Sequence, residues 1–279
     1  MAVKIVTDST ADMPQDLAKA LGITVVPLNV HFGEETFRDG VDINSDQFFE
    51  KLQSSPKLPT TSQPSVGAFL ETYRALLDDG HDLVSIHISA KLSGTMNSAT
   101  QAQEQLGVGS RLEVIDSYLA GLALSIVAVA AAKAVENGAS QAEVIEVVKQ
   151  ASKNTRCFTL VETLEYLQRG GRIGKAAAFL GSLLHVRPVL EVRDGEIHPL
   201  ERVRTRPKGI QRLYELATTN GTVERVAVAH ATTPDEAADL GKWMQSFVPA
   251  EEIIQTRIGP VIGTHAGPGS MGIAVQIKE

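Results

Sequence analysis

Two clusters of hydroxyl residues stand where the chain could bind an anion. Ser93, Gly94 and Thr95 separate a β-branched run from a stretch with helical spacing, and the segment 60–64 (Thr-Thr-Ser-Gln-Pro) again directly precedes such a stretch. Where a strand ends and a helix begins, the first backbone N–H groups of the helix have no partner and the helix dipole is positive. Both clusters therefore favour an anion site. The alternative for the first is that Ser93 only caps the helix and Gly94 eases the turn.

His265 lies in a run of small residues, 263–269 (Gly-Thr-His-Ala-Gly-Pro-Gly). Small neighbours let the backbone pass closely against another part of the molecule and leave the imidazole uncrowded. A histidine so placed can donate a hydrogen bond to an oxyanion or act as a base. The alternative is an exposed histidine in a loop.

Ser93 and His265 also allow a second interpretation, a serine hydrolase. Ser93 would be the nucleophile, His265 the base, and an acid such as Asp116 or Asp235 would lie between them in the chain order of the α/β-hydrolases. Ser93 lacks the glycines of the usual nucleophile elbow, however, because a lysine stands two residues before it and a threonine two residues after it.

A compact basic turn contains Arg169 and Arg172, in Arg-Gly-Gly-Arg. Three arginines further along, Arg202, Arg204 and Arg206, have the same character. The guanidinium fork suits carboxylates and phosphates, so these residues are candidates for anion or partner recognition. The alternative for any one of them is a solvated surface charge.

Two glycine-rich segments fit nucleotide-binding motifs only in part. Residues 267–272 match GxGxxG, but they directly precede the last predicted strand, where the motif requires a helix and, further on, an acidic residue. Residues 170–175 (Gly-Gly-Arg-Ile-Gly-Lys) are one residue short of a P-loop, and Ala176 follows where a hydroxyl residue is required. The seven histidines form no HxH or HxxxH pair. We therefore expect neither a nucleotide cofactor nor a metal.

Composition limits the classes of protein that the chain can be. Its 279 residues are 43% hydrophobic and 21% charged, as in ordinary globular proteins of one large or two ordinary domains. The net charge of -7 argues against a dedicated nucleic-acid binder. The single cysteine, Cys157, fits a reducing compartment, and the N-terminus runs into a strand without the features of a signal peptide, so we expect a cytoplasmic protein.

The first half of the chain alternates β-branched runs with helical spacing, which predicts βαβ units and a parallel sheet. The predicted strands are 3–7, 24–30, 83–88 and 112–115, and the predicted helices are 14–21, 45–53, 66–77, 95–106, 119–136 and 141–152. We expect Ser45 to cap its helix. The proline- and hydroxyl-rich segment 54–64 predicts a loop.

The character of the sequence changes after Asn154. The second half predicts strands near 158–161, 188–192, 197, 225–229, 252–257 and 272–277, and helices at 175–184, 207–218 and 234–247. An Asp-Gly pair at 194–195 predicts a hairpin. We therefore expect an α/β protein of two domains: 1–154, an N-terminal α/β (Rossmann-like) domain with a parallel sheet, and 155–279, a C-terminal α+β domain with a mixed sheet.

Five motifs, in order along nearly the whole chain, resemble the DegV family. They are Val-Thr-Asp-Ser-Thr-Ala-Asp (6–12), Thr-Ser-Gln-Pro (61–64), Leu-Ser-Gly-Thr (92–95), Gly-Gly-Arg-Ile (170–173) and Ile-Gly-Thr-His-Ala-Gly-Pro-Gly (262–269). Members of that family are two-domain α/β proteins that hold a long-chain fatty acid in the cleft between the domains. They are the non-catalytic carrier subunits of bacterial fatty acid kinase, and a separate kinase subunit phosphorylates the carboxyl group.

The resemblance implies a role for each residue that matches a family motif. The implied carboxylate ligands are Ser93 and Thr61, with His265 and the Gly94 N–H, and with Ser62 and Thr95 beside them. The implied docking positions for the kinase are Arg172 and Arg202, with Arg169 as a neighbour. The implied partners are a long-chain fatty acid, the catalytic subunit of fatty acid kinase and, transiently, a membrane surface, with no cofactor.

A fatty acid also requires an apolar tunnel, because each buried methylene stabilises the complex by roughly 0.8 kcal/mol. The segment 176–184 and the alanine-rich helix after Tyr118 are candidate walls, and they are equally well explained as protein core. A third interpretation is a structural or regulatory module for which the bound lipid is incidental.

Overall fold

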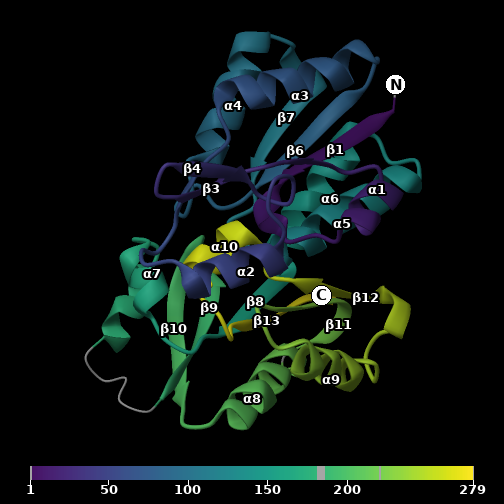
Figure 1. The fold of residues 1–279 in the computed structure, drawn as a ribbon. Helices are drawn as coiled ribbons and strands as arrows, with labels where there is room; N and C mark the ends of the chain where they lie inside the picture. Colours follow the sequence, from purple (N-terminus) through teal and green to yellow (C-terminus); the bar gives the residue numbers. More distant parts are fainter. Residues whose placement is uncertain (1, 181–185, 220, 279) are drawn as a thin grey trace.

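The computed structural model describes residues 2–180, 186–219 and 221–278, and over these residues the strands form three sheets (Figure 1). The first is a parallel sheet of four strands in the order β2-β1-β6-β7. Its strands are β1 (Val3–Asp8), β2 (Thr24–Val26), β6 (Asp82–His87) and β7 (Leu112–Asp116). Every strand pairing in this sheet is parallel, as the sequence predicts for βαβ units.

Helices cover both faces of the parallel sheet. They are α1 (Gln15–Ala20), α3 (Val66–Asp78), α4 (Thr95–Leu106), α5 (Leu122–Glu136) and α6 (Gln141–Asn154). α3 and α4 pack on one face, around the buried side chains of Phe69, Tyr73 and Leu83. α5 and α6 pack on the other face (Figure 1).

The second sheet is mixed and follows α6 without a linker. Its order is β10-β9-β8-β13-β11-β12, and among its pairings only β11 with β12 is parallel. Its strands are β8 (Thr155–Leu160), β9 (Arg187–Arg193), β10 (Glu196–Val203), β11 (Thr222–His230), β12 (Ile253–Arg257) and β13 (Met271–Lys278). α8 (Arg206–Thr218) and α9 (Pro234–Met244) cover one face around Leu213 and Leu240. The predicted hairpin at Asp194 and Gly195 joins β9 to β10.

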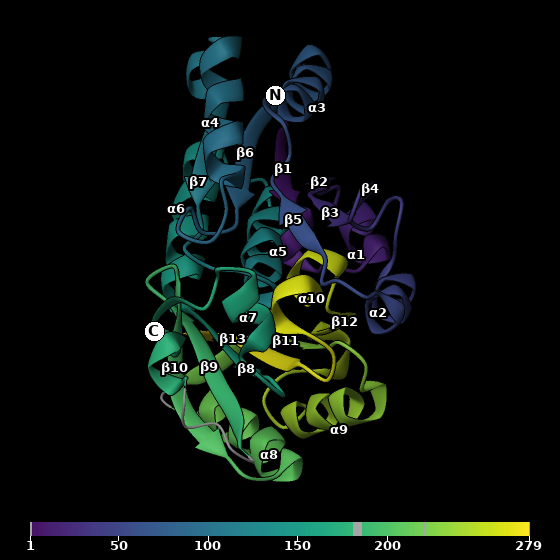
Figure 2. The ribbon, with the colours of Figure 1, turned by 60° about the vertical axis from the view of Figure 1, so that its left-hand side comes forward.

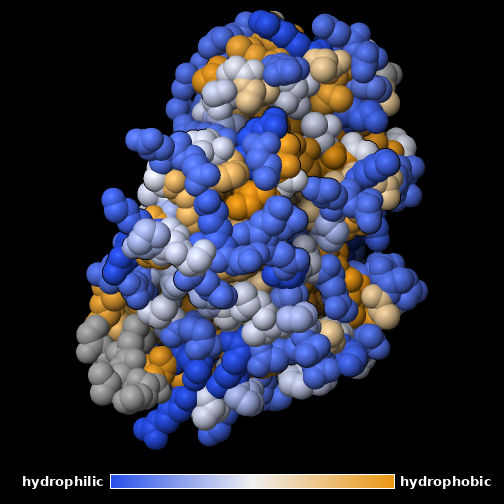
Figure 3. All heavy atoms as spheres, in the orientation of Figure 1, coloured by the Kyte–Doolittle hydropathy of each residue, from blue (hydrophilic) through white to orange (hydrophobic). Residues whose placement is uncertain are grey.

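Helix α5 packs against both large sheets. It contacts β1 of the parallel sheet and β8, β11 and β13 of the mixed sheet, and its residues from Leu122 to Ala132 are all buried. A helix that is buried all round must be apolar all round, which explains the uncharged run that ends at Lys133. None of the described helices combines the length and apolar character that a bilayer span requires. The outer face seen in Figure 3 is mostly hydrophilic.

A small antiparallel sheet, in the order β4-β3-β5, lies beside the other two and was only partly expected. Its strands are β3 (Asn29–Phe32), β4 (Glu35–Arg38) and β5 (Thr60–Ser62). The prediction of one strand over 24–30 is wrong, because the chain leaves the parallel sheet at Pro27, which has no N–H, and the Leu28 N–H binds the Ser9 hydroxyl. The prediction that 54–64 is entirely loop is wrong at 60–62, which pair with β3.

Two further expectations on helices need correction, and two helices were not expected. Asn44, not Ser45, caps α2 (Ser45–Ser54), through a reciprocal pair of hydrogen bonds with Gln47. The expected helix at 175–184 is a 3-10 helix at Gly174–Phe179, with the next residue extended, and 181–185 lie outside the described residues. Two short helices were not expected, α7 (Glu165–Arg169) and α10 (Pro260–Ala266). α10 packs against α7, α2 and β5 (Figure 2).

Candidate functional site

A cavity of about 250 Å³ lies between the two large sheets, where the carboxyl ends of β1 and β6 face α10 and the mixed sheet. Its wall also includes β5, the first turn of α5, and inward-facing residues of β8 and β9. The volume exceeds the ~150 Å³ of an engineered apolar cavity that takes up benzene, so a packing defect does not explain it. Open parallel sheets bind ligands at this end of their strands.

The polar end of the cavity is formed by β5 and α10. Thr61 of β5 and His265 in the last turn of α10 both line the cavity, and Thr61 Oγ1 lies 2.9 Å from His265 Nε2. These residues are 204 positions apart in the sequence. The structure therefore brings together two residues that the sequence singled out separately, and it places His265 on a short helix, not in an exposed loop.

The imidazole of His265 is held in its neutral form. Burial, followed by the positive charge of Arg172, lowers the pKa of His265 to about 4. Its Nδ1 is buried and has no partner among the described residues. Because an unpaired buried acceptor is better tolerated than an unpaired buried N–H, we assign the ring proton to Nε2. His265 then donates to Thr61, and the Thr61 hydroxyl proton is free to donate into the cavity.

Ser93 lines the cavity next to the start of α4. Its Oγ lies 2.8 Å from Thr95 Oγ1 and also accepts the Thr95 N–H. Ser93 therefore has the capping role that was the alternative interpretation, and it faces the cavity as well. Thr95 itself is fully buried behind Ser93.

Gly94 precedes α4 and packs under the side chain of Gln63. A Cβ atom at Gly94 would lie 2.2 Å from Gln63 Oε1, so a larger residue there would have to displace this side chain. Gln63 lines the cavity and donates to Ser98 Oγ. The sequence analysis quoted Gln63 only as part of a motif and gave it no role.

Ser62 differs from its neighbour Thr61 in the direction of its side chain. Successive residues of a strand face opposite sides, so the Ser62 hydroxyl points away from Thr61, toward β3. There its Oγ lies 2.9 Å from His31 Nε2, and Asn29 donates to it. Ser62 contributes to the cavity wall, while its hydroxyl already has partners on the exposed face of the small sheet.

The three arginines that the family resemblance implies as docking positions lie in different places. Arg172 is partly buried, lines the cavity, and donates to the carbonyl groups of Leu92 and Gly170. Arg169 is exposed and forms an ion pair with Glu165. Arg202 is exposed on β10, with its guanidinium 4.2 Å from the centre of the Phe179 ring. Only Arg172 of the three belongs to the cavity.

Aliphatic side chains form most of the remaining wall. They come from five helices or strands and from four loops, and are Leu28, Ile88, Leu92, Leu122, Val161, Leu167, Leu190, Val192, Ile197, Ile258, Val261 and Ile262. Of the alanine-rich helix that was expected to form a wall, only Leu122 in the first turn lines the cavity. The expected wall from 176–184 is wrong for its described part, 176–180, which packs against β10 and does not line the cavity.

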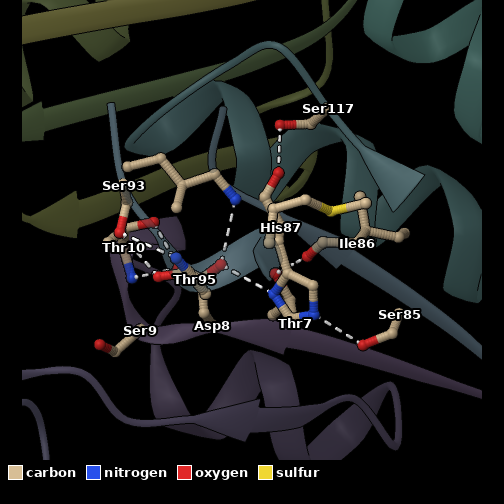
Figure 4. A network of polar contacts seen from close by, with 12 residues as sticks. Thr7, Asp8, Ser9, Thr10, Ser85, Ile86, His87, Ser93, Thr95 and Ser117 are labelled. Carbon is tan, nitrogen blue, oxygen red and sulfur yellow. Dashed lines mark hydrogen bonds and ion pairs between the residues drawn. The ribbon is translucent and has the colours of Figure 1, made fainter. Parts of the chain in front are cut away.

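The structure does contain a chain of Ser, His and Asp side chains, but not the one considered above (Figure 4). His87 Nδ1 lies 2.9 Å from Asp8 Oδ2, and His87 Nε2 lies 2.7 Å from Ser85 Oγ, which also contacts the Tyr73 hydroxyl. All four side chains are completely buried, and none lines the cavity. Asp8 also accepts the Ile88 N–H and both donors of Thr10. This chain fixes the ends of β1 and β6, which border the cavity.

Thr10 and Asp12 also line the cavity and were missed as individual residues. The signal that could have found them is the motif at 6–12, whose polar residues directly follow a buried strand at the carboxyl end of a parallel sheet. No group of three or more His, Cys, Asp or Glu side chains among the described residues could hold a metal ion.

Comparison with known proteins agrees with this architecture. The model of the DegV family, described as an uncharacterised protein family, matches residues 2–278. A DegV domain-containing protein of Halalkalibacterium halodurans is 40% identical, and the match covers 99% of each chain.

Two solved structures match this chain over its whole length and over the whole of their own length. One is a DegV family protein from Thermus thermophilus, described by its fatty acid binding, with a TM-score of 0.90 and 35% identity. The other is DegV from Bacillus subtilis, described as a fatty acid binding protein, with a TM-score of 0.88 and 37% identity. Because the family model, the relative and both structures extend over essentially all of the chain, this protein belongs to the DegV family.

Proposed function

We propose that the protein binds one long-chain fatty acid in the cavity, with the carboxylate at Thr61, Ser93 and His265 and the acyl chain along the aliphatic walls. The observation that carries this proposal is the distribution of polar and apolar groups in the cavity: hydroxyl groups, one of them oriented by His265, lie at one end, and aliphatic side chains cover most of the rest. Small-molecule sites combine such walls with a few polar groups that fix orientation. The fatty acid binding described for the two similar structures supports it.

The charge arrangement supports a carboxylate as the head group. Thr61 and Ser93 supply hydroxyl donors, and Arg172 supplies positive charge at the same end. A neutral His265 avoids burying a second cation, which would have to be desolvated together with the ligand. Gly94 and Thr95, which the family resemblance also implies as ligands, would act mainly by shaping the turn that presents Ser93.

Denaturing extraction of the purified protein, followed by mass spectrometry of the extract, tests the proposal. We expect about one fatty acid per chain, or uptake to that ratio when a fatty acid is added. A purified protein that is empty and does not take up an added fatty acid would overturn it. The identity of the extracted acid would also give the chain length and unsaturation that the protein retains.

The second part of the proposal is that the protein presents the bound carboxylate to a separate kinase subunit. This carrier role in the cytoplasm, without a nucleotide site of its own, rests on the family resemblance. It is supported by the exposed positions of Arg169 and Arg202, which a partner can reach from solvent, although Arg169 is paired with Glu165 and Arg202 lies over the Phe179 ring. Transient contact with a membrane surface, from which a poorly soluble fatty acid would be collected, belongs to the same proposal.

A charge reversal separates docking from binding. We expect Arg202→Glu to reduce acyl phosphate formation with a cognate kinase at least several-fold, because reversing a charge at a contact repels the partner. Bound fatty acid should remain unchanged, since Arg202 does not line the cavity. Lys242→Glu, an exposed change on α9, is the matched control. Equal activity of the two variants would remove Arg202 from the docking surface and favour a binding module that is independent of a kinase.

The serine hydrolase alternative has less support in the geometry. Ser93 Oγ contacts Thr95, not His265, and no acidic side chain among the described residues contacts His265. Asp116 accepts the backbone N–H groups of Ala90 and Tyr118 instead. We expect no labelling of Ser93 by a covalent serine hydrolase probe, and labelling at Ser93 would return this alternative to first place.

A further inference from the structure

A second polar patch lies in the cavity, at the other end of α10 from His265. Asp12 lines the cavity and is only 6% exposed. Its Oδ1 accepts the N–H of Gly259, the residue that precedes α10, at 2.9 Å. A helix of seven residues is roughly 10 Å long, so Asp12 is separated from the head-group site by about this length of α10. The patch therefore faces the acyl part of the cavity.

The second oxygen of Asp12 is unpartnered. Asp12 Oδ2 is buried, and no described residue forms a hydrogen bond with it. Burial, and then repulsion from Asp39, raise the pKa of Asp12 well above its ordinary value, so the carboxyl group favours its protonated form. A protonated carboxyl group can both donate and accept a hydrogen bond. A polar group this well buried normally has a partner, so its absence here points to a ligand atom or a water molecule.

The first turn of α5 faces the same part of the cavity. Ala120, Gly121 and Leu122 line it, and no side chain caps this end of the 15-residue helix. The first N–H groups of a helix have no carbonyl partner inside it, and the helix dipole is positive there. A Cβ atom at Gly121 would lie 4.0 Å from Asp12 Oδ2, at van der Waals distance, so the unpartnered carboxyl oxygen and the start of α5 are neighbours in the cavity wall.

We propose that Asp12 and the first turn of α5 form a mid-chain subsite for an oxygen atom of the acyl chain, so that the cavity accepts hydroxylated long-chain fatty acids. This inference rests on the fatty acid site proposed above. The Ala123 N–H is already directed at the Cys157 thiol, so the donor that α5 offers is the N–H of Leu122. A hydroxyl group matches the subsite because it can accept from this N–H and share a hydrogen bond with Asp12 Oδ2. In a uniformly apolar tunnel the same hydroxyl would be buried without a partner, which weakens binding.

Binding of stearic acid and of a stearic acid hydroxylated near the middle of its chain tests the subsite. We expect the wild-type dissociation constants for the two acids to agree within about three-fold. A uniformly apolar tunnel would instead bind the hydroxylated acid about ten-fold more weakly, or worse. Asp12→Gly removes the contact with Gly259, on which both acids depend, and also the partner of the hydroxyl group, so it should weaken binding of the hydroxylated acid about ten-fold more than binding of stearic acid. Asp12→Asn, which keeps a donor and an acceptor, should retain both affinities.

Asp12 has a φ of 50°, and both replacement residues tolerate this left-handed conformation. If Asp12→Gly does not fold, the wild-type protein alone supplies the comparison. It should bind stearic acid hydroxylated near mid-chain more tightly than the isomer hydroxylated next to the terminal methyl group. Rejection of both isomers alike would overturn the subsite. Equal loss of stearic acid and its hydroxylated form in a folded Asp12→Gly would assign Asp12 to structure only. If the wild-type protein binds neither acid, the proposed function itself fails.

Discussion

At the scale of single residues, the hydroxyl donors of the proposed head-group site are uncharged. Each is held in place by a contact on its side away from the ligand. His265 fixes Thr61, and Thr95 fixes Ser93, each through one short contact. A donor held in one orientation before binding loses less entropy when the carboxylate arrives. Hydroxyl donors also leave carboxylate oxygens less fully enclosed than a bidentate arginine would, which fits the proposal that a kinase subunit phosphorylates this group.

Neighbouring residues of β5 give a direct test of this arrangement. We expect Thr61→Val to weaken fatty acid binding by about ten-fold, because it removes one hydrogen bond to a buried carboxylate, worth about 1 to 3 kcal/mol, at constant side-chain volume. The measurement is the dissociation constant for a fluorescent fatty acid.

Ser62→Ala is the matched control for Thr61→Val. The Ser62 hydroxyl contacts His31 on the other side of the strand, so affinity should change less than two-fold. A loss at Ser62 as large as that at Thr61 would return Ser62 to the carboxylate ligands that the family resemblance implies.

A buried acidic residue near the site makes stability depend on pH. Burial raises the pKa of Asp39 from 3.8 to about 7, and Asp39 is 5% exposed. Because the folded state holds this proton more tightly than the unfolded state, the stability linked to Asp39 is fully present below pH 3.8 and is lost as the pH rises toward 7. Asp39→Asn removes this loss, since an amide does not titrate.

We therefore expect Asp39→Asn to be more stable than the wild type by about 1 to 3 kcal/mol at pH 8 and to differ little at pH 4. Urea unfolding at the two pH values measures the difference. The Ser9 and Val261 contacts, which favour the charged form of Asp39, reduce the gain. A variant that is less stable at both pH values would show that these contacts outweigh the burial of the charge.

At the scale of elements, α10 is the part on which the site depends most. Asp12 binds the Gly259 N–H that precedes it, Gly263 in its middle packs against Phe48 and Phe49 of α2, and His265 lies in its last turn. A helix of seven residues is too short to be stable alone, so these tertiary contacts hold it in place. A shift of α10 would move His265 away from Thr61.

Alanine variants of two helical glycines can distinguish the effect of this packing from the effect of helix propensity. A Cβ atom at Gly263 would lie 2.8 Å from ring atoms of Phe48 and Phe49, whereas one at Gly67 of α3 would find only Ser65 Oγ, at 3.6 Å. We expect Gly263→Ala to lower stability by about 1 to 3 kcal/mol and to weaken fatty acid binding. Gly67→Ala should raise stability by about 0.5 to 1 kcal/mol through its better helix propensity and leave binding unchanged.

Thermal unfolding and fatty acid titration of both variants give the comparison. Similar stability changes in the two variants would mean that α10 can move away from α2 without cost. Unchanged binding in a destabilised Gly263→Ala would show that the position of His265 does not depend on this contact.

The elements that the sequence predicted well are those whose patterns are local. The parallel strands are β-branched runs, and helices such as 95–106 have both periodicity and an end signal, so their bounds agree closely with the structure. β5 and α10 were missed because they are short and are defined by long-range contacts. The contact of Asp8 with His87 joins residues 79 apart that no motif connects. The proposed carboxylate ligands were singled out from sequence motifs, whereas the directions of their side chains, including the opposite faces of Thr61 and Ser62, could be known only once β5 was seen as a strand.

At the scale of the whole molecule, the two large sheets share one core. The main cluster of buried residues includes Val84 and Ile86 of the parallel sheet, most of α5, and Ala227 and Ala274 of the mixed sheet. Hydrogen bonds also cross between the halves, from Thr256 to the Asp12 carbonyl and from Ser89 to the Gly195 carbonyl. We propose 1–154 and 155–279 as units of architecture, and this shared core predicts that they do not unfold independently.

We therefore expect a single cooperative unfolding transition, with calorimetric and van't Hoff enthalpies in agreement. A bound fatty acid contacts both halves in the proposed complex, so at about one hundred times its dissociation constant it should stabilise the whole transition by about 2.7 kcal/mol. Differential scanning calorimetry with and without a fatty acid measures both quantities.

A fragment of 155–279 expressed alone would expose the alanines that face α5, and it should fail to unfold cooperatively. Two separate transitions, only one of which moves with the fatty acid, would show instead that the halves are independent and that the ligand is held by one of them.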